Sequence, residues 1–403
     1  MANNNENKVL NVPHLRFPEF GGDWKMERLD EIATLSKGIG ISKEELSDDG
    51  EPCILYGELY TKYKSEIINE IYSKTDIDNS KLKRSNANDV IIPCSGETAE
   101  DIATARCIPF DNILLGGDLN IISLHQHNGA FMSYQLNGKR KFDIARVAQG
   151  VSVVHLYGEH LKAIMTYNPC LQEQQKIAKL LSLIDERIAT QNKIIDKLQS
   201  LIKGLVDELM TVLLKGKLYP FSSFYIKAGE GGTPTTSVVE YYTEGTIPFI
   251  KIEDLSCKYL TNNKDFITEL GMQKSSAWLI PSKSVIYSNG ATIGAISINE
   301  YPVCTKQGIL GIVPNTNINV EYLYLLMSSS YFSKEISRII TEGTMKTAYL
   351  KDINHIKCPL PSMAQQKNIT NLTSSIEEKL SIEQELLRFL NLQKQYLLHM
   401  MFI

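Results

Sequence analysis

Hydrophobic residues recur every three or four positions over a long stretch in the middle of the chain. Between Ile177 and Val212 the spacing of apolar positions alternates between four and three, with one polar interruption at Gln191. A heptad sustained over this length predicts a long helix whose apolar seam packs against a second helix in a coiled coil. Pro169 precedes the pattern and Gly216 follows it, as is typical of a helix start and a helix end.

A second heptad pattern occupies the end of the chain. Ser362 and Gln365 have the spacing of a capping box, in which both side chains bind free backbone N–H groups. Seven of the ten seam positions from 369 to 401 are apolar, so this helix is the weaker one alone, and we expect it to pair with the first helix. The polar seam residues Gln191 and Glu383 occupy equivalent places, and either they fix the register of the pair or they are exposed to solvent.

The two helical stretches belong to an internal duplication with an offset of 192 residues. Five residues around the start of the first helix recur at this offset: Gln174, Ile177, Leu180, Ser182 and Ile184 return as Gln366, Ile369, Leu372, Ser374 and Ile376. Upstream, Tyr157 returns as Tyr349 and Pro169 as Pro361. This period is far above that of solenoid repeats, so each half is a globular domain followed by one long helix.

The segments before the two helices combine strand-like runs with helical stretches. The strand-like runs are bounded by Gly, Asn, Asp or Pro and lie at 53–56, 90–93, 248–252, 284–287 and 308–313. Helical stretches lie at 321–327 and 331–339. These features predict an α+β fold with mainly antiparallel sheets. We therefore expect an N-terminal segment at 1–22, a first domain at 23–168, a central helix at 169–215, a second domain at 216–360 and a C-terminal helix at 361–403.

Composition narrows the functional classes. The 403 residues carry 42 basic and 46 acidic side chains, a net charge of −4, which excludes a strongly basic stand-alone nucleic-acid binder. No run of about 18 apolar residues is present, and residues 1–8 lack the features of a secretory signal. The seven cysteines are scattered without a CxxC pair, which argues against a disulfide framework or a zinc module. We expect a reduced, cytoplasmic protein with no membrane partner.

Motifs for catalysis are mostly missing. The sequence has no GxxxxGK[ST] phosphate loop, no HExxH metal motif and no GxSxG nucleophile elbow. Asn168-Pro169 is similar to part of the Asn-Pro-Pro-aromatic motif of DNA amino-methyltransferases, but the aromatic residue and a glycine-rich cofactor loop are missing. Glu377-Glu378-Lys379 has the spacing of a nuclease-like ExK motif, but it falls in the second predicted helix, where an exposed helix face explains it better.

Four segments resemble the specificity subunit of Type I restriction–modification enzymes, in the order found in that family. They are Val12–Trp24, Glu173–Ala178, Gly231–Thr235 and Ile247–Leu255. The resemblance implies two target-recognition domains that each read one half of a split DNA site, and two helices that pair antiparallel and separate the domains. It also implies a non-catalytic subunit that directs adenine methylation or restriction by its partners.

The resemblance further implies partners and cofactors. The chain would bind double-stranded DNA, two methylation subunits that carry S-adenosylmethionine, and restriction subunits that use ATP and Mg, and it would hold no cofactor or metal itself. The DNA target would be two short half-sites around an unspecified gap. Two other functions stay open from the residues: a self-contained DNA adenine methyltransferase, and a coiled-coil adaptor without DNA readout.

Candidate DNA contacts are polar and basic side chains that we expect on exposed loops, since these side chains read base edges in the major groove. In the first domain they are Lys37, Ser42, Lys43, Tyr60, Thr61, Lys62, Ser95, Thr98, Gln149 and Ser152. In the second domain they are Thr233, Thr235, Thr236, Lys251, Ser288, Asn289, Thr292, Lys306, Gln307, Thr344 and Lys346. Gly96 and Gly290 are expected to need a positive φ after a strand.

The charge of the two domains bears on how DNA would be held. The first domain has a net charge of −6 and the second of +1, so neither is a strong phosphate binder. Lys81–Arg84 and Lys139–Lys141 are candidates for phosphate contact. We expect the methylation subunits to supply much of the grip on phosphates, while this chain supplies base contacts.

Overall fold

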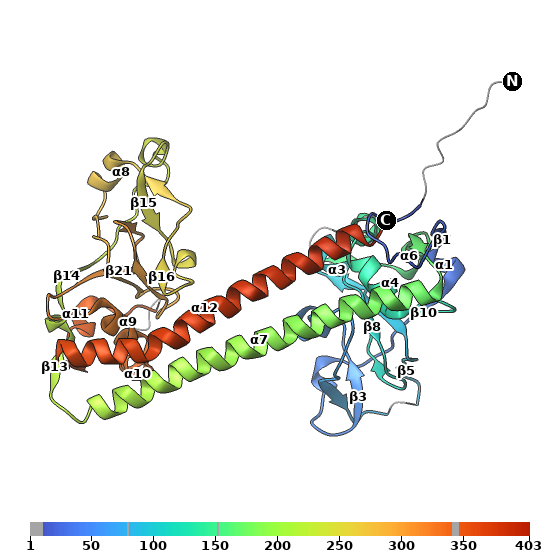
Figure 1. The fold of residues 1–403 in the computed structure, drawn as a ribbon, viewed down its shortest axis with the longest axis horizontal. Helices are drawn as coiled ribbons and strands as arrows, with labels where there is room; N and C mark the ends of the chain where they lie inside the picture. Colours follow the sequence, from blue (N-terminus) through green and yellow to red (C-terminus); the bar gives the residue numbers. More distant parts are fainter. Residues whose placement is uncertain (1–10, 79, 151–152, 341–345) are drawn as a thin grey trace. The chain divides into compact units, whose positions relative to one another are not determined.

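The computed structural model describes residues 11–78, 80–150, 153–340 and 346–403. This part of the chain forms two compact units (Figure 1). Unit 1 contains the described residues up to Asn192 together with Glu385–Ile403, and unit 2 is Lys193–Gln384. No helix in the described residues is long and apolar enough to cross a membrane.

Two helices are much longer than the others that the structure describes. Helix α7 spans Leu171–Leu213 and helix α12 spans Met363–Met400. The predicted capping box starts α12: the N–H of Ser362 donates to Oε1 of Gln365 at 3.0 Å, and the N–H of Gln365 donates to Oγ of Ser362 at 3.4 Å. Both side chains thereby satisfy backbone donors that have no partner inside the helix.

The two long helices pair antiparallel, because the start of each packs in the same unit as the end of the other. In unit 1, Ile177 and Leu181 of α7 share an apolar cluster with Met401, directly after α12. In unit 2, Val206 near the end of α7 shares a cluster with Ile369 near the start of α12. The predicted pairing is confirmed.

The predicted seam holds along both helices except at one end. All ten seam positions from 369 to 401 are buried or partly buried. In α7 the last seam position, Val212, is 61% exposed, while Val206 and Met210 are buried in the core of unit 2. The prediction is wrong there because this end of α7 packs against the globular part of the unit as well as against α12. Gln191 and Glu383 are both buried, so solvent exposure does not explain these polar positions.

Unit 1 is built on a four-stranded antiparallel sheet in the order β2-β10-β6-β8. Its strands are β2 Ala33–Lys37, β10 Leu119–Leu124, β6 Asp89–Pro93 and β8 Arg106–Ile108. A second sheet comprises, in spatial order, β4 Ser73–Thr75, β3 Glu51–Ile54, β9 Leu114–Leu115 and β5 Lys83–Arg84. Two short pairs are β1 Lys25–Arg28 with β12 Met165–Asn168, and β7 Ser95–Gly96 with β11 Val154–His155. The short helices are α1 Leu29–Ile32, α2 Glu58–Thr61, α3 Ala99–Ile102, α4 Gly129–Asn137, α5 Lys141–Val147 and α6 Gly158–Lys162.

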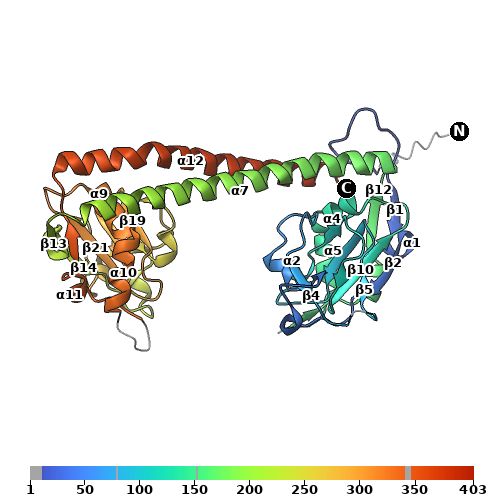
Figure 2. The same ribbon diagram turned by 90° about the horizontal axis from the view of Figure 1, so that it is seen from below.

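The central sheet of unit 1 is covered on both faces, because successive side chains of a strand point to opposite faces. Val90 and Ile92 of β6 pack with α4, α5 and α6, while Ile91 between them packs with β3 and β9. Figure 2 shows α4 and α5 beside β10 in this unit. The continuous apolar run at 90–92 therefore reflects a strand buried on both sides.

Unit 2 repeats this design. Its central sheet comprises, in spatial order, β14 Tyr225–Glu230, β21 Ile309–Pro314, β18 Val285–Ser288, β19 Ile296–Asn299 and β16 Tyr259–Leu260. A smaller sheet contains β17 Phe266–Ile267, β15 Ile247–Ile250 and β20 Cys304–Thr305, and β13 Leu218–Pro220 pairs with β22 Lys357–Pro359. The short helices are α8 Glu269–Gln273, α9 Val320–Ser328, α10 Ser330–Ile339 and α11 Leu350–Ile353. In Figure 1, α8 and β15 lie at the end of this unit that is away from α7 and α12.

The strand pairs are mainly antiparallel, as predicted. Among the described strands, the parallel pairs are β3 with β9, β15 with β20 and β16 with β19. Short 3-10 helices lie in the described connections at Lys43–Glu45, Phe221–Ser223, Val239–Tyr241 and Ile252–Asp254.

A buried glutamine explains part of the sequence repeat. Oε1 of Gln174 accepts the N–H of Asn128 at 2.9 Å, and Oε1 of Gln366 accepts the N–H of Asn319 at 2.7 Å. In both repeats Nε2 donates at 2.9 Å to the carbonyl of the proline before the long helix. Asn128 and Asn319 in turn cap α4 and α9. The same amide thus ties each long helix to the helix that covers the central sheet.

Candidate nucleic-acid interface

One end of the central sheet in unit 1 gathers three of the predicted contact residues. Nζ of Lys37, at the end of β2, lies 3.4 Å from Oδ1 of Asp118, and Oγ of Ser95 lies 3.4 Å from Oδ2 of the same residue. Oγ of Ser95 is also 3.4 Å from Nδ1 of His155, which forms a two-bond backbone pair with Gln149 at 2.7 and 2.9 Å. Asp118 and His155 were not predicted, and they join strand ends that are far apart in the sequence.

Tyr60 and Thr61 extend this surface into a cavity. The hydroxyl of Tyr60 donates to the carbonyl of Ser95 at 2.9 Å, and these residues line a cavity of about 690 Å³ together with Tyr56, Glu97, Asp101 and Arg106. Arg106 is turned inward and donates to the carbonyl of Tyr63 at 3.0 Å, and burial lowers its pKa. The accessible charges in the cavity are therefore acidic, which suits amino groups of bases better than phosphates.

The other predicted residues of unit 1 are placed less favourably. Ser42 and Lys43 are exposed at a 3-10 helix, where the N–H of Ser42 donates to Glu45 at 2.6 Å. Lys62 is held by Glu58 at 2.7 Å, and Oγ1 of Thr98 accepts an N–H at the start of α3. These two side chains serve the fold of the unit. Ser152 lies outside the described residues.

Unit 2 gathers predicted residues at the same end of its central sheet. Oγ1 of Thr233, just after β14, accepts the N–H of Gln307, just before β21, at 3.4 Å. The N–H of the adjacent Lys306 donates to the carbonyl of Ile250 at 3.0 Å, and its side chain is exposed. The strands β14 and β21 occupy the places that β2 and β10 have in unit 1, so the two sites are equivalent in the repeat.

The same turn precedes the central strand in both sites. In unit 1 the carbonyl of Asp118 accepts the N–H of Cys94 at 2.7 Å, and in unit 2 the carbonyl of Gly308 accepts the N–H of Asn289 at 3.0 Å. The φ angle is 58° at Asp118 and 85° at Gly308. A positive φ is uncommon for a residue other than glycine, so the turn in unit 1 holds Asp118 in this conformation at some cost in conformational energy.

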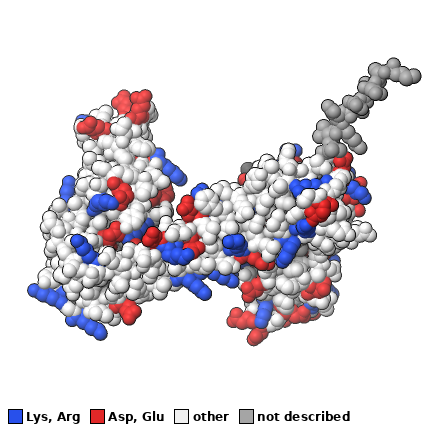
Figure 3. Space-filling view, viewed as in Figure 1, with Lys and Arg blue, Asp and Glu red and all other residues white. Residues whose placement is uncertain are grey.

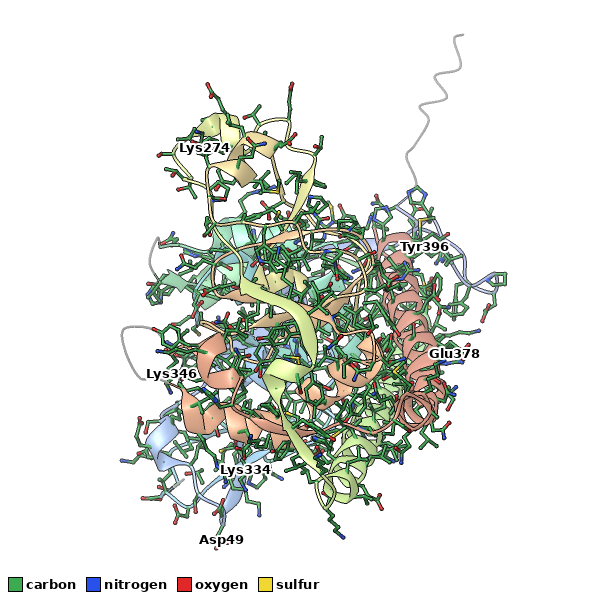
Figure 4. All side chains as sticks on the ribbon, turned by 90° about the vertical axis from the view of Figure 1, so that its left-hand side faces the viewer. Asp49, Lys274, Lys334, Lys346, Glu378 and Tyr396 are labelled. Carbon is green, nitrogen blue, oxygen red and sulfur yellow. The ribbon has the colours of Figure 1, made fainter. Side chains whose placement is uncertain are left out.

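Ser288 and Asn289 do not lie on an exposed loop, so this expectation is wrong. They are 0% and 1% exposed. Asn289 donates through Nδ2 to the carbonyl of Ala348 at 3.1 Å and accepts the N–H of Ala348 at 2.9 Å. These bonds bring Lys346, whose side chain is exposed, to the edge of unit 2 (Figure 4). Thr344 lies outside the described residues.

The expected positive φ at Gly96 and Gly290 is also wrong, because neither residue is among those with a positive φ. Both positions instead lack room for a side chain. A Cβ at Gly96 would lie 3.0 Å from the hydroxyl oxygen of Tyr60, and a Cβ at Gly290 would lie 3.2 Å from Cα of Gly308. The close approach of neighbouring chain segments thus requires glycine at these strand ends.

The remaining candidates show no common site. Lys251 pairs with Asp265 at 2.8 Å, and this hydrogen bond raises the pKa of Lys251. Thr235, Thr236 and Thr292 are exposed. Of the two runs considered for phosphate contact, Arg84 pairs with Glu51 at 2.6 Å and Arg140 donates to the carbonyl of Ile403 at 3.1 Å.

Basic side chains are interspersed with acidic ones on the described face drawn in Figure 3, without a continuous basic patch. The two motifs considered for catalysis have structural roles. Asn168 is buried and donates to Glu27 at 3.0 Å. Glu377 accepts from Lys258 at 2.6 Å and is partly buried, so the interpretation of this residue as part of an exposed helix face is wrong.

Helix α12 carries an apolar surface that unit 1 leaves uncovered. Leu386, Phe389, Leu392 and Tyr396 are between 38% and 57% exposed. Their spacing places them on one side of the helix, and Figure 4 shows Tyr396 directed outward from α12. A strip of exposed large apolar side chains is typical of a surface that binds another protein.

The chain matches the family model described as the Type I restriction modification DNA specificity domain at residues 21–200 and again at 224–391. The MjaVIII specificity subunit of Methanocaldococcus jannaschii is 25% identical over 401 residues, which cover 92% of this chain and 89% of the relative. The EcoR124I/EcoR124II specificity subunit of Escherichia coli is 28% identical over 231 residues, covering 51% of this chain and 55% of the relative. The MjaIX specificity subunit of M. jannaschii is 30% identical over 154 residues, covering 37% and 35%. The last two matches thus span about half and a third of the relatives' length.

Two solved structures share the fold. The S subunit of a Type I restriction–modification system from M. genitalium has a TM-score of 0.59 and 19% identity over 97% of this chain and 99% of that chain. A second structure, from work on complex assembly and conformational transition of the type I system, has a TM-score of 0.56 and 14% identity over 96% and 98%. Because the family model covers most of the chain in two stretches, the chain belongs to the Type I restriction–modification specificity subunits, a non-catalytic family, and it contains two copies of the DNA specificity domain.

Proposed function

We propose that the chain recognises a bipartite DNA site with an unspecified gap and assembles a Type I complex around it. In this proposal 23–168 and 216–360 are the target-recognition domains, and 169–215 and 361–403 are the helices that separate them. The chain directs adenine methylation or restriction, and partner subunits carry out the chemistry.

The observation that carries the proposal is the equivalent placement of polar side chains in the two units. Lys37, Ser95 and Gln149 meet at one end of the central sheet of unit 1, and Thr233 and Gln307 meet at the same end of the sheet in unit 2. The frame is the same while the polar residues differ. Two such sites suit two half-sites of different sequence, since base contacts specify the sequence and backbone contacts position the protein.

The charge of the chain supports a division of labour with its partners. The exposed surface lacks a continuous basic patch on the described face of Figure 3, and the cavity in unit 1 contains Glu97 and Asp101. Affinity for DNA comes largely from neutralised phosphates. We therefore assign most phosphate contacts to the methylation subunits and base readout to this chain.

The partners and cofactors in the proposal are double-stranded DNA, two methylation subunits with S-adenosylmethionine, and restriction subunits with ATP and Mg. The exposed strip formed by Leu386, Phe389, Leu392 and Tyr396 supports docking of a methylation subunit on α12. The proposed location is the cytoplasm, where DNA and these partners are available.

The proposal is tested by mapping methylated adenines across the genome in cells with and without this gene, with the methylation partner present in both. We expect a split motif, two short specified parts around unspecified bases, that disappears on deletion and returns with the intact gene. A methylome that does not change on deletion, in cells where the partners co-purify with the chain, would contradict the proposal.

Exchange of one domain tests the modular part of the proposal. Replacing 216–360 by the matching region of a relative is expected to change one half of the motif and leave the other half unchanged. A simultaneous change of both halves would show that the domains do not read separately. The matched control replaces Thr316, which is exposed beyond the opposite end of β21 from Gln307, and should leave the motif intact.

The two alternative functions predict different results for the isolated chain and for the assembled complex. A self-contained methyltransferase would bind S-adenosylmethionine and methylate DNA as an isolated chain. A coiled-coil adaptor would bring partners together, but the assembled complex would retain cognate and scrambled DNA equally.

A further inference from the structure

Tyr157 of unit 1 and Tyr349 of unit 2 occupy the same place in the duplicated fold. They are separated by the repeat offset of 192 residues, and each directly precedes a short helix, α6 or α11. Their φ and ψ angles are −91° and 141° for Tyr157 and −73° and 140° for Tyr349. The side chains are 53% and 46% exposed, so core packing does not account for a tyrosine at this place in both repeats.

The hydroxyl groups of both residues are available. Neither hydroxyl group has a hydrogen-bond partner among the residues that the structure describes. Three buried or half-buried tyrosines differ in this respect: Tyr60 donates to Ser95, Tyr134 to Asp185 and Tyr322 to Pro359. Tyr157 and Tyr349 thus present an aromatic ring and a free donor to the surroundings.

Buried asparagine amides hold the residue before each tyrosine. Nδ2 of Asn120 donates to the carbonyl of Leu156 at 2.9 Å, and the N–H of Leu156 donates to the carbonyl of Cys94 at 2.9 Å. In unit 2, Asn289 makes both bonds to Ala348, at 3.1 and 2.9 Å. The two amides come from strands that are not equivalent, since Asn120 lies in β10 and Asn289 follows β18. Different residues therefore fix the same backbone position.

Both tyrosines lie beside the candidate nucleic-acid interface. The ring of His155, which lies 3.4 Å from Oγ of Ser95, stacks on Tyr157 with centroids 6.2 Å apart. In unit 2, Tyr349 follows the residue that Asn289 holds, and Nζ of Lys351 lies 5.5 Å from its ring. Each tyrosine is thus anchored at the sheet end where the predicted contact residues gather.

We infer that Tyr157 and Tyr349 are equivalent contacts to the sugar–phosphate backbone of DNA, an inference that rests on the proposed function. Residues that meet bases differ between domains that read different half-sites. The sugar–phosphate backbone is the same in both half-sites, so an identical residue at an identical place suits the backbone. The tyrosine hydroxyl donates to a phosphate oxygen, and Asn120 and Asn289 position it without touching DNA.

The test uses the chain in complex with its methylation partners and the variants Tyr157→Phe and Tyr349→Phe, singly and together. The probes are a duplex that carries the motif from the methylome map and a duplex of equal length with both half-sites scrambled. Each variant is expected to weaken binding to both duplexes roughly tenfold, and the double variant by the product. The affinity ratio of the two duplexes should stay constant, and so should the salt dependence, because a neutral hydroxyl releases no counterion.

The control is Tyr72→Phe, since Tyr72 is 54% exposed in unit 1 and is not part of the interface. Unchanged affinity in the tyrosine variants would overturn the inference. So would a changed ratio between the two duplexes, which indicates base readout, or loss of co-purifying methylation subunits, which indicates a protein contact. If the wild-type complex does not prefer the motif duplex, the proposed function is refuted, and the inference that rests on it is refuted as well.

Discussion

A buried lysine holds the globular part of unit 1 against both long helices. Nζ of Lys394 on α12 lies 2.6 Å from Glu66 and 2.7 Å from Asp185 of α7. The three side chains are only 14%, 10% and 8% exposed. Asp185 also accepts hydroxyl groups from Tyr134 at 2.6 Å and Ser65 at 3.0 Å. We predict that Lys394→Met destabilises unit 1 strongly, because two neighbouring carboxylates would remain buried without their cation.

The magnitude follows from the burial. Breaking a buried ion pair by removing one partner costs about 3–5 kcal/mol, whereas an exposed pair contributes about 1 kcal/mol or less. Burial raises the pKa of Glu66, and the two carboxylates outweigh the burial of Lys394 and raise its pKa. Glu66 therefore ionises less readily in the folded state, so the loss in Lys394→Met should shrink as the pH falls and Glu66 is protonated.

The assay is urea unfolding of the full chain followed by tryptophan fluorescence. The chain has two tryptophans, and Trp24, 2% exposed, lies in unit 1. A Trp278→Phe background leaves Trp24 as the only reporter. The matched control is Lys162→Met, because Lys162 pairs with Glu159 at 2.6 Å on the surface of the same unit. Equal midpoints for Lys394→Met and Lys162→Met, or a loss that grows at low pH, would refute the reasoning.

Three further changes give defined outcomes. Burial lowers the pKa of His127 below 6.5, so its contribution to the free energy of unfolding is present above that pH and is lost as the pH falls. The variant His127→Ile copies Ile318 of the second repeat. It should remove this part of the pH dependence in urea titrations. A Cβ at Gly231 would lie 2.0 Å from the carbonyl oxygen of Thr305, so Gly231→Ala should lower the free energy of unfolding by about 1–3 kcal/mol or more in thermal unfolding. The control Gly57→Ala, with open space around it, should not. Equal losses in the two variants would contradict the crowding at Gly231. Inserting one heptad into both α7 and α12 should lengthen the unspecified gap in the methylated motif and leave its specified bases unchanged; new bases would count against a spacer role.

The long helices could be predicted because their signal is local. Heptad spacing and the Ser362–Gln365 pair act within a few turns, and every predicted seam position from 369 to 401 is buried or partly buried, as expected. The prediction failed at Val212, at the end of α7 that packs against the globular core of unit 2 as well as against α12. This packing involves the globular part of unit 2, which the periodicity of the helix sequence does not reveal.

The candidate site was predicted only in part because strand order assembles it. Asp118 and His155 join Ser95 from positions 23 and 60 residues away. Asn289 reads as a loop residue in sequence, yet it is buried because its partner Ala348 lies 59 residues further on. A signal for Tyr157 and Tyr349 was present in the sequence, since both lie on the repeat offset.

The different origins of the two asparagine clamps limit where this chain can recombine. The partner of Leu156 is an amide on β10, whereas the partner of Ala348 follows β18. The matching positions in the other repeat are Leu310 and Cys94, respectively. A crossover inside a central sheet would create a hybrid with two amides competing for one carbonyl, or with none. We therefore expect productive junctions in the long helices, where both repeats keep the same glutamine anchor, so that a whole domain is exchanged at once.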